Sequence, residues 1–189
     1  MKILLAGFEP FGEREVNNAL EVLRLFANRP NIDTVEVPVS FERAHRVVIE
    51  AIEGKSYDFV LMMGETSRTT DYIRLERLAI NFKDSLMADN DGVAADEETI
   101  VEDGQSAYFT NFPVKQMAEK LKASGHKVKV TNSTGVFVCN SLYYNVLHYV
   151  KTTNINIVPI FVHLPVSTDV LSLSDMKSAI EELIVNLVE

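Results

Sequence analysis

Three residues of this chain have the types and settings that nucleophilic catalysis requires, and the first is a cysteine. Cys139 is the only cysteine among 189 residues, and it follows the turn 133–135 at the expected start of a helix. The dipole of a helix lowers the pKa of a thiol at its N-terminus, which favours the nucleophilic thiolate. A lone cysteine can equally be a small buried apolar residue. The catalytic hypothesis therefore depends on finding a base and an orienting acid.

The candidate base is one of four histidines. His163 ends the apolar run Ile160-Phe161-Val162, whereas the other three occupy helix faces or a turn: His45, His126 and His148. In open α/β sheets, ligands bind and chemistry occurs at the carboxyl ends of strands. His163 is therefore the expected general base, although a histidine at such a position can also be purely structural.

The candidate acid is Glu76. It lies in phase with three large apolar residues of the same expected strand, Leu78, Ile80 and Phe82. A carboxylate on an apolar face needs a partner. An imidazole would provide one, and the carboxylate would then fix the tautomer of the ring. An internal ion pair with Arg74 or Arg77 is an equal alternative.

The elements that would position these residues alternate along the chain. Strands are expected at 2–6, 34–39, 57–63, 127–131 and 157–164, and helices at 18–26, 42–52, 113–121, 139–150 and 176–187. This alternation predicts one α/β domain over residues 1–189, with a mainly parallel sheet covered by helices on both faces. The polar segment 84–105 does not fit the pattern. It could be a lid, a contact surface or a disordered segment.

Composition and motifs exclude several classes of function. The 18 basic and 27 acidic residues give a net charge of −9, which does not suit nucleic-acid binding. No apolar run approaches the ~18 residues needed to span a bilayer, and a single cysteine cannot form an internal disulfide, so we expect a cytoplasmic protein. Residues 7–12 have P-loop glycine spacing but lack the following lysine. The acidic residues near Gly92 fit a calcium loop poorly, and no zinc pattern is visible. We therefore expect no metal and no cofactor.

An ordered set of short motifs runs along nearly the whole chain. They are Gly7-Phe8-Glu9-Pro10-Phe11-Gly12, Glu76-Arg77-Leu78-Ala79-Ile80-Asn81, Asp89-Asn90-x-Gly92, Ala107-Tyr108-Phe109, Phe112-Pro113-Val114-Lys115, Gly135-Val136-Phe137-Val138-Cys139-Asn140 and Phe161-Val162-His163-Leu164-Pro165. Together they resemble the pyroglutamyl peptidase I (pyrrolidone-carboxyl peptidase) family of cysteine peptidases. The resemblance implies that Glu76, Cys139 and His163 are catalytic.

The resemblance also implies a fold, an assembly and a substrate. The implied fold is a three-layer α/β/α sandwich, commonly assembled as a homotetramer. The implied substrates are peptides with an N-terminal pyroglutamyl residue, and that residue would be released through a thioester intermediate. The implied substrate-binding residues are Phe8, Phe11, Glu65, Phe137 and Val138, with Glu65 standing where a glutamine is usual. An apolar slot suits a neutral lactam, whereas a free α-ammonium group would be desolvated there without a partner.

Two other functions remain open, and one departure from the family bears on the rate. The chain could be a binding or scaffold protein with the same fold, or another Cys-His-Glu amide hydrolase such as a glutaminase. In the family an arginine close to the active site stands where this chain has Leu86. The resemblance therefore implies slower turnover unless Arg68 or Arg74 compensates.

Overall fold

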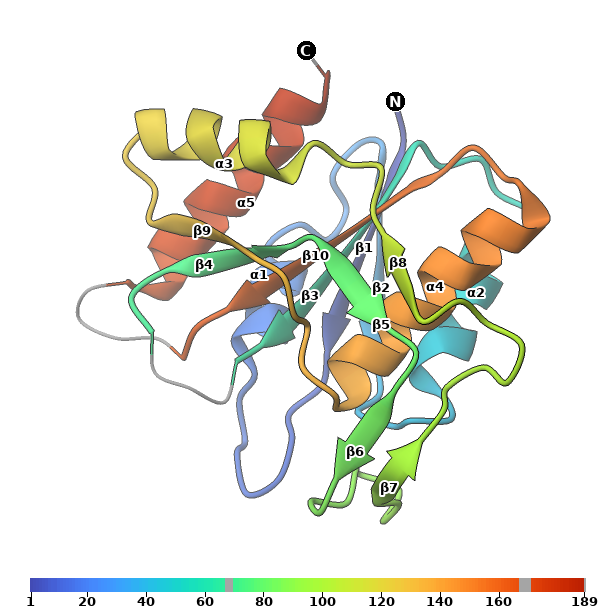
Figure 1. The fold of residues 1–189 in the computed structure, drawn as a ribbon. Coiled ribbons are helices and arrows are strands. Elements are labelled where there is room, and N and C mark those ends of the chain that lie inside the picture. The colour runs from blue at the N-terminus through green and yellow to red at the C-terminus, as the bar shows by residue number, and fades with distance from the viewer. Residues whose placement is uncertain (67–69, 167–170, 189) are drawn as a thin grey trace.

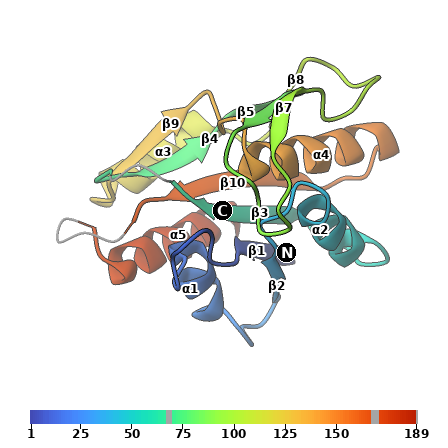
Figure 2. The same cartoon turned by 90° about the horizontal axis from the view of Figure 1, so that it is seen from below.

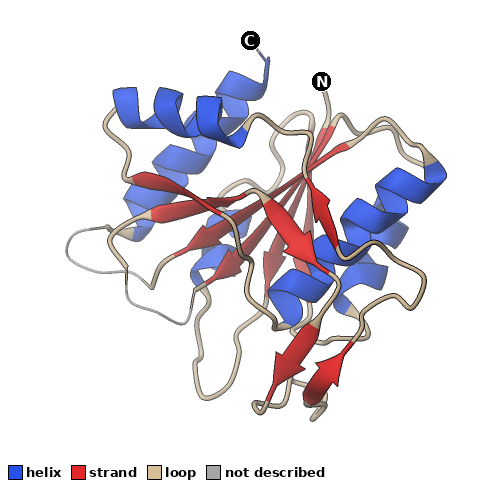
Figure 3. Ribbon diagram, in the orientation of Figure 1, coloured by secondary structure: helices blue, strands red, loops and turns tan. Residues whose placement is uncertain are grey.

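The computed structural model of the protein describes residues 1–66, 70–166 and 171–188. Its central feature is a six-stranded sheet in the order β2-β1-β3-β10-β4-β9, drawn in red in Figure 3. The strands are β1 (Ile3–Phe8), β2 (Ile32–Val37), β3 (Phe59–Glu65), β4 (Ile73–Glu76), β9 (Val128–Thr131) and β10 (Val158–Leu164). Strands β2, β1, β3 and β10 are parallel, β4 runs antiparallel to β10, and β9 runs parallel to β4.

Helices cover both faces of this sheet. One face packs against α1 (Asn18–Arg24), α3 (Val114–Ala123) and α5 (Leu173–Val188), and the other packs against α2 (Ala44–Ile52) and α4 (Val138–Thr153). Figures 1 and 2 show α1 and α5 on the opposite side of the sheet from α2 and α4. The expected three-layer α/β/α architecture is therefore confirmed. No helix in the described ranges is both long enough and apolar enough to cross a membrane.

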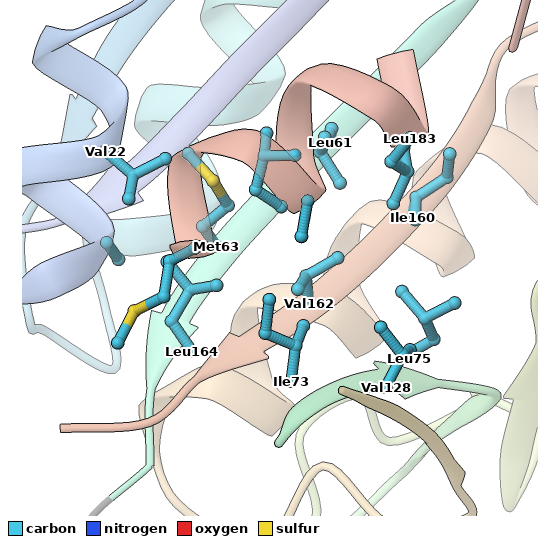
Figure 4. Close-up of a cluster of buried hydrophobic side chains, with 14 of the residues drawn as sticks. Val22, Leu61, Met63, Ile73, Leu75, Val128, Ile160, Val162, Leu164 and Leu183 are labelled. Carbon is cyan, nitrogen blue, oxygen red and sulfur yellow. The ribbon is translucent and has the colours of Figure 1, made fainter. Parts of the chain in front are cut away.

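The two cores follow from strands that are apolar on both faces. In β3, Leu61 and Met63 join the core beneath α1 and α5, whereas Val60 and Met62 join the core beneath α4. Figure 4 shows the first core, in which Leu61 and Met63 lie among side chains of α1, α5 and β10. Each large aliphatic side chain that is fully buried contributes about 1.5–3 kcal/mol to folding. The two-sided burial therefore holds the carboxyl ends of β1, β3 and β10 together at one edge.

The expected continuous strand from Glu76 to Phe82 is wrong. The chain leaves the main sheet at Arg77, and β5 (Leu78–Ile80) pairs instead with β8 (Ala107–Phe109) in a separate two-stranded sheet. The buried residue of β5 is Ala79, while its neighbours are only half-buried. The side-chain amide of Asn140 forms hydrogen bonds with the backbone N–H and C=O of Ile80. These bonds hold β5 in its register with β8.

The segment 84–105 contains ordered structure that its polarity did not predict. Strands β6 (Lys83–Ser85) and β7 (Ala95–Glu98) pair as an antiparallel hairpin that projects beyond the main sheet (Figure 1). The carboxylate of Asp89 accepts backbone N–H groups from Phe41, Asp91 and Val93. Asp89 therefore ties the loop of the hairpin to the segment before α2.

Candidate active site

Cys139 lies at the N-terminal end of α4, as its sequence context predicted. It is the second residue of the helix and is half-buried. Phe137, the residue just before the helix, provides no side-chain cap, and its C=O accepts the N–H groups of Asn140 and Ser141. The first N–H groups of a helix have no acceptor within the helix. Those of Val138 and Cys139 have no acceptor in the described parts of the chain either, so two donors stay available beside the thiol.

His163 and Glu76 form a buried pair across the neighbouring strands β10 and β4. The Nδ1 atom of His163 lies 2.8 Å from Oε1 of Glu76, whose side chain is fully buried. The other carboxylate oxygen, Oε2, accepts the hydroxyl of Thr131 at 2.5 Å. Both oxygens are therefore bonded, as a buried carboxylate requires. Because Nδ1 faces the carboxylate, the imidazole turns its Nε2 atom away from Glu76.

The electrostatics of His163 link it to both other members of the group. Burial opposes the charged ring, but the hydrogen bond and charge of Cys139, followed by those of Glu76, outweigh it and raise the pKa of His163 to about 9. With Nδ1 bonded to Glu76, the nitrogen that meets Cys139 is Nε2. The imidazole thus lies between a buried carboxylate and a thiol, the order that a nucleophile, a base and an orienting acid require.

Gly64 at the end of β3 leaves the space in which the thiol and the imidazole meet. A Cβ atom at this position would lie 2.9 Å from Sγ of Cys139, 3.2 Å from Cζ of Phe161 and 3.3 Å from Cδ2 of His163. The closest of these separations is shorter than normal van der Waals contact. A side chain at position 64 therefore cannot be added without moving the sulfur.

We expect Gly64→Ala to lower kcat by about 10²-fold, because small displacements of reacting groups reduce rates by this order. Alkylation by iodoacetamide provides a second readout, since Cys139 is the only thiol and its modification can be followed by mass spectrometry. The variant should react more slowly than the wild type while unfolding at a similar temperature. Wild-type activity in a folded Gly64→Ala protein would contradict the proposed position of the sulfur.

A cavity opens over these residues and continues into a small apolar recess. The main cavity has a volume of about 620 Å³ and contains Cys139, His163 and Arg74 in its wall. The recess, which we call the slot, has a volume of about 60 Å³. Its lining residues are Phe8, Phe11, Asn17, Val39, Glu65, Phe137, Val138 and Cys139. All five substrate-binding residues that the resemblance implied therefore line one recess beside the thiol.

Aromatic rings give the slot its shape. The ring centroids of Phe11 and Phe137 are 5.1 Å apart, and Phe41 packs edge-on against Phe137 at 5.2 Å. Phe8 is almost completely buried at the base. Contacts of this kind add about 0.5–1.5 kcal/mol beyond area burial. The slot is therefore a rigid apolar recess suited to a flat, uncharged ring.

Glu65 is the charged exception in the slot, and it is neutralised locally. Its carboxylate forms an ion pair with Arg14 and accepts the backbone N–H of Asn18 at 2.9 Å. Burial raises the pKa of Glu65, although the Asn18 N–H and the Arg14 charge act in the opposite direction. The Arg14–Glu65 pair thus leaves no uncompensated charge at this point of the slot.

The structure places only one of the two arginines that could replace the family arginine. Arg74 lies in the cavity wall, whereas Arg68 falls outside the described residues. The Leu86 side chain is 99% exposed on the β6–β7 hairpin and does not line the cavity. The equal alternative of an ion pair between Glu76 and a neighbouring arginine is wrong, because His163 and Thr131 occupy the carboxylate.

Sequence patterns did not reveal three supporting residues. Thr131 holds the second oxygen of Glu76, Gly64 makes room for the sulfur, and Asn140 fastens the start of α4 to β5. Asn140 is adjacent to the cysteine, so its position was a usable signal, but Thr131 and Gly64 act only through contacts distant in sequence. In the described ranges no group of three or more histidine, cysteine, aspartate or glutamate side chains is placed to hold a metal ion.

Comparisons with known proteins agree with this geometry. The pyroglutamyl peptidase family model matches residues 1–186. A pyrrolidone-carboxylate peptidase of Aliivibrio fischeri is 40% identical over 87% of this chain and 78% of its own length, and one of Vibrio vulnificus is 37% identical over 100% and 89%. The crystal structure of the pyrrolidone carboxyl peptidase of Fervidobacterium islandicum superposes with a TM-score of 0.91 at 31% identity, covering 99% of this chain and 98% of that one. Pyroglutamyl peptidase I of Bacillus amyloliquefaciens gives 0.88 at 30% identity, covering 96% and 94%.

Proposed function

Because the chain belongs to the pyroglutamyl peptidase family of cysteine peptidases, we propose that Cys139, His163 and Glu76 hydrolyse the amide bond that follows an N-terminal pyroglutamyl residue. The observation that carries this proposal is the position of the thiol between the buried His163–Glu76 pair and an apolar slot. The first feature supplies acyl-transfer chemistry, and the second selects an uncharged ring.

The slot accounts for substrate selection. A pyroglutamyl ring is a neutral lactam, so it loses little on entering a recess walled by Phe8, Phe11 and Phe137. Glu65 can accept the lactam N–H, because each carboxylate oxygen accepts more than one hydrogen bond. An ordinary N-terminus would place an ammonium group in the slot, where Arg14 already neutralises the carboxylate. The ammonium group would then be buried without a partner, so the slot rejects charged N-termini.

The first chemical step forms a thioester. The Cys139 thiol gives its proton to Nε2 of His163. The sulfur then attacks the pyroglutamyl carbonyl carbon and forms a C–S bond. The carbonyl π electrons move to the oxygen, and the backbone N–H groups of Val138 and Cys139 at the start of α4 are the available donors to that oxyanion. Glu76 keeps Nδ1 of the ring protonated and supports the positive imidazolium.

The second half of the reaction releases both products. As the oxyanion collapses, the C–N bond breaks and His163 donates its Nε2 proton to the departing amine. Water then attacks the thioester carbonyl and gives a proton to the same nitrogen. The C–S bond breaks, which yields free pyroglutamate and returns the sulfur and imidazole to their starting state.

The test of this function is the rate of fluorophore release from three amides under reducing conditions. We expect hydrolysis of the pyroglutamyl amide, and rates at least 10²-fold lower for the prolyl and glutaminyl amides, because buried unpaired charge disfavours both competitors. Prolyl amide is the matched control, since it keeps the five-membered ring but carries an ammonium charge. Comparable or faster hydrolysis of the glutaminyl amide would instead assign the protein to another class of amide hydrolase.

The Arg14–Glu65 ion pair leads to a prediction about specificity. Arg14→Met leaves the Glu65 carboxylate without its counter-charge, so an ammonium group that enters the slot can pair with it. We expect the ratio of pyroglutamyl to prolyl amide hydrolysis to fall about 10-fold or more, since hydrogen bonds to charged groups are worth about 1.5–3 kcal/mol. Arg14→Lys keeps the charge and should preserve selectivity. An unchanged ratio in Arg14→Met would show that Arg14 does not set the charge balance of the slot.

We extend the proposal to location and assembly. A catalytic thiol must remain reduced, which supports action in the cytoplasm. The family resemblance supports a homotetramer. Light scattering of the purified protein measures that state directly, and a mass equal to that of one chain would contradict it.

A further inference from the structure

Arg74 is a cationic side chain placed beside the catalytic group without a task in the mechanism above. Along β4, Ile73 and Leu75 join the core beneath α1, α3 and α5, so Arg74 and Glu76 point to the opposite face. Arg74 is directly opposite His163 in the antiparallel β4–β10 register. It lines the same cavity as Cys139 and His163.

One nitrogen of the Arg74 guanidinium lacks the partner that a buried donor normally has. Its Nε atom is buried and has no hydrogen-bond partner, and no carboxylate in the described parts of the chain forms an ion pair with it. Its guanidinium lies over the ring of Tyr72, whose centroid is 5.9 Å from Cζ. A buried donor without a partner costs about 1–3 kcal/mol, and more when it is charged. An acceptor that reaches Nε from the cavity would recover this cost.

The order of strands shows which part of a substrate would meet Arg74. The slot lies by the ends of β1 and β3, whereas Arg74 belongs to β4, and β10 separates the two in the sheet. His163, on β10, donates a proton to the departing amine, so the leaving part of the peptide must extend from His163 away from the slot. Arg74 lies on that side, next to His163 in the register.

Among the charged side chains that line the cavity in the described parts of the chain, Arg74 is a cation that no carboxylate neutralises. The Glu65 carboxylate is already paired with Arg14, and Asp84 on β6 forms no ion pair with Arg74. Lys129, opposite Arg74 in β9, places its ammonium 3.8 Å from the centroid of the Tyr72 ring and adds positive charge nearby. A guanidinium presents a planar fork of donors that matches a carboxylate.

We propose that Arg74 binds a carboxylate on the leaving part of the substrate, which makes acidic pyroglutamyl peptides the preferred substrate class; this rests on the proposed function. The carboxylate can be the side chain of the second residue or the free C-terminus of a pyroglutamyl dipeptide. Both present the same anion to the same donors. Arg74 is thus a specificity-determining residue, and its effect depends on the charge of the leaving group.

Three substrates distinguish the two sources of carboxylate. They are pyroglutamyl-glutamine amide, which is neutral, pyroglutamyl-glutamate amide, which adds a side-chain carboxylate, and pyroglutamyl-glutamine, which adds a C-terminal one. We expect wild-type kcat/KM to be higher for at least one acidic substrate than for the neutral one. In Arg74→Gln, kcat/KM for that acidic substrate should fall by about 10- to 100-fold, and kcat/KM for the neutral substrate by less than about 3-fold.

Arg24→Gln is the matched control, because it removes the same charge from an exposed ion pair with Glu21 on α1. It should leave all three values unchanged. Equal losses for the three substrates in Arg74→Gln, or no loss for any, would overturn the inference while leaving the proposed function intact. A wild-type protein that cleaves none of the three would overturn the proposed function, and this inference with it.

Discussion

Replacement of Cys139 by alanine is expected to reduce hydrolysis of a pyroglutamyl amide to the background rate. The side chain supplies the bond-forming atom, and its loss cannot be compensated, because the chain contains no other thiol. Removing a nucleophile from a triad enzyme typically lowers kcat by about 10⁶-fold. Cys139→Ser retains a hydroxyl of similar size but lacks the acidity of a thiol, and it should also lose several orders of magnitude.

Two controls accompany this measurement: one tests whether the variant is folded, and the other tests whether the wild-type thiol is required. Cys139 is only half-buried, so the alanine variant should keep the circular dichroism spectrum and nearly the unfolding temperature of the wild type. Iodoacetamide should inactivate the wild type with incorporation of one equivalent. If a folded Cys139→Ala protein kept its full activity, the nucleophile would have to be sought elsewhere.

Glu76→Gln is expected to produce the second-largest effect and to change the pH profile. The substitution keeps the size of the side chain but removes the negative charge at 2.8 Å from the His163 ring. In a serine-protease triad the equivalent change lowers kcat by about 10⁴-fold, and we expect a loss of about 10²–10⁴-fold here. Thr131→Val, which removes one hydrogen bond but leaves the charge, should cost less.

The sign of the pH effect follows from the causes of the His163 pKa. Cys139 and Glu76 together raise that pKa to about 9 against the effect of burial, so the ring stays protonated below about pH 9 and loses its proton above it. The leaving amine needs this proton, so wild-type kcat/KM should fall as the pH rises through about 9. Removing the Glu76 charge lowers the pKa of the ring, and the alkaline limb should move to lower pH. An unshifted limb would mean that Glu76 does not support the imidazolium.

Local patterns were sufficient to predict the main elements and the positions of Cys139 and His163 at their ends. The apolar run before His163 forms β10, and Cys139 lies at the start of α4. These features depend on burial periodicity and on the positions of strand ends, which single segments encode. The position of the acidic partner was harder to predict, because Glu76 was assigned from the alternation of residues 76–82, and that strand is interrupted at Arg77. Its burial was predicted, whereas the strand that carries it was not.

The remaining features depend on contacts between distant segments. Asn140 fixes the register of β5 across 60 positions, and Asp89 organises the β6–β7 loop through N–H groups as distant as that of Phe41. Neither interaction produces a periodic signal. The antiparallel pairing of β4 with β10 is also set by tertiary packing, and this pairing places Arg74 opposite His163. Charged and polar side chains that act by long-range pairing therefore had to be located in the structure.

We propose that Cys139 attacks a carbonyl group whose pyroglutamyl ring occupies the adjacent slot. Covalent labelling by a pyroglutamyl chloromethyl ketone tests it directly, with the glutaminyl analogue as control and the modified residue located by mass spectrometry. We predict one equivalent of label, carried by Cys139, with a rate at least 10²-fold above that of the glutaminyl reagent and slowed by a pyroglutamyl peptide amide. Equal rates for the two reagents, or a label on another residue, would contradict the account.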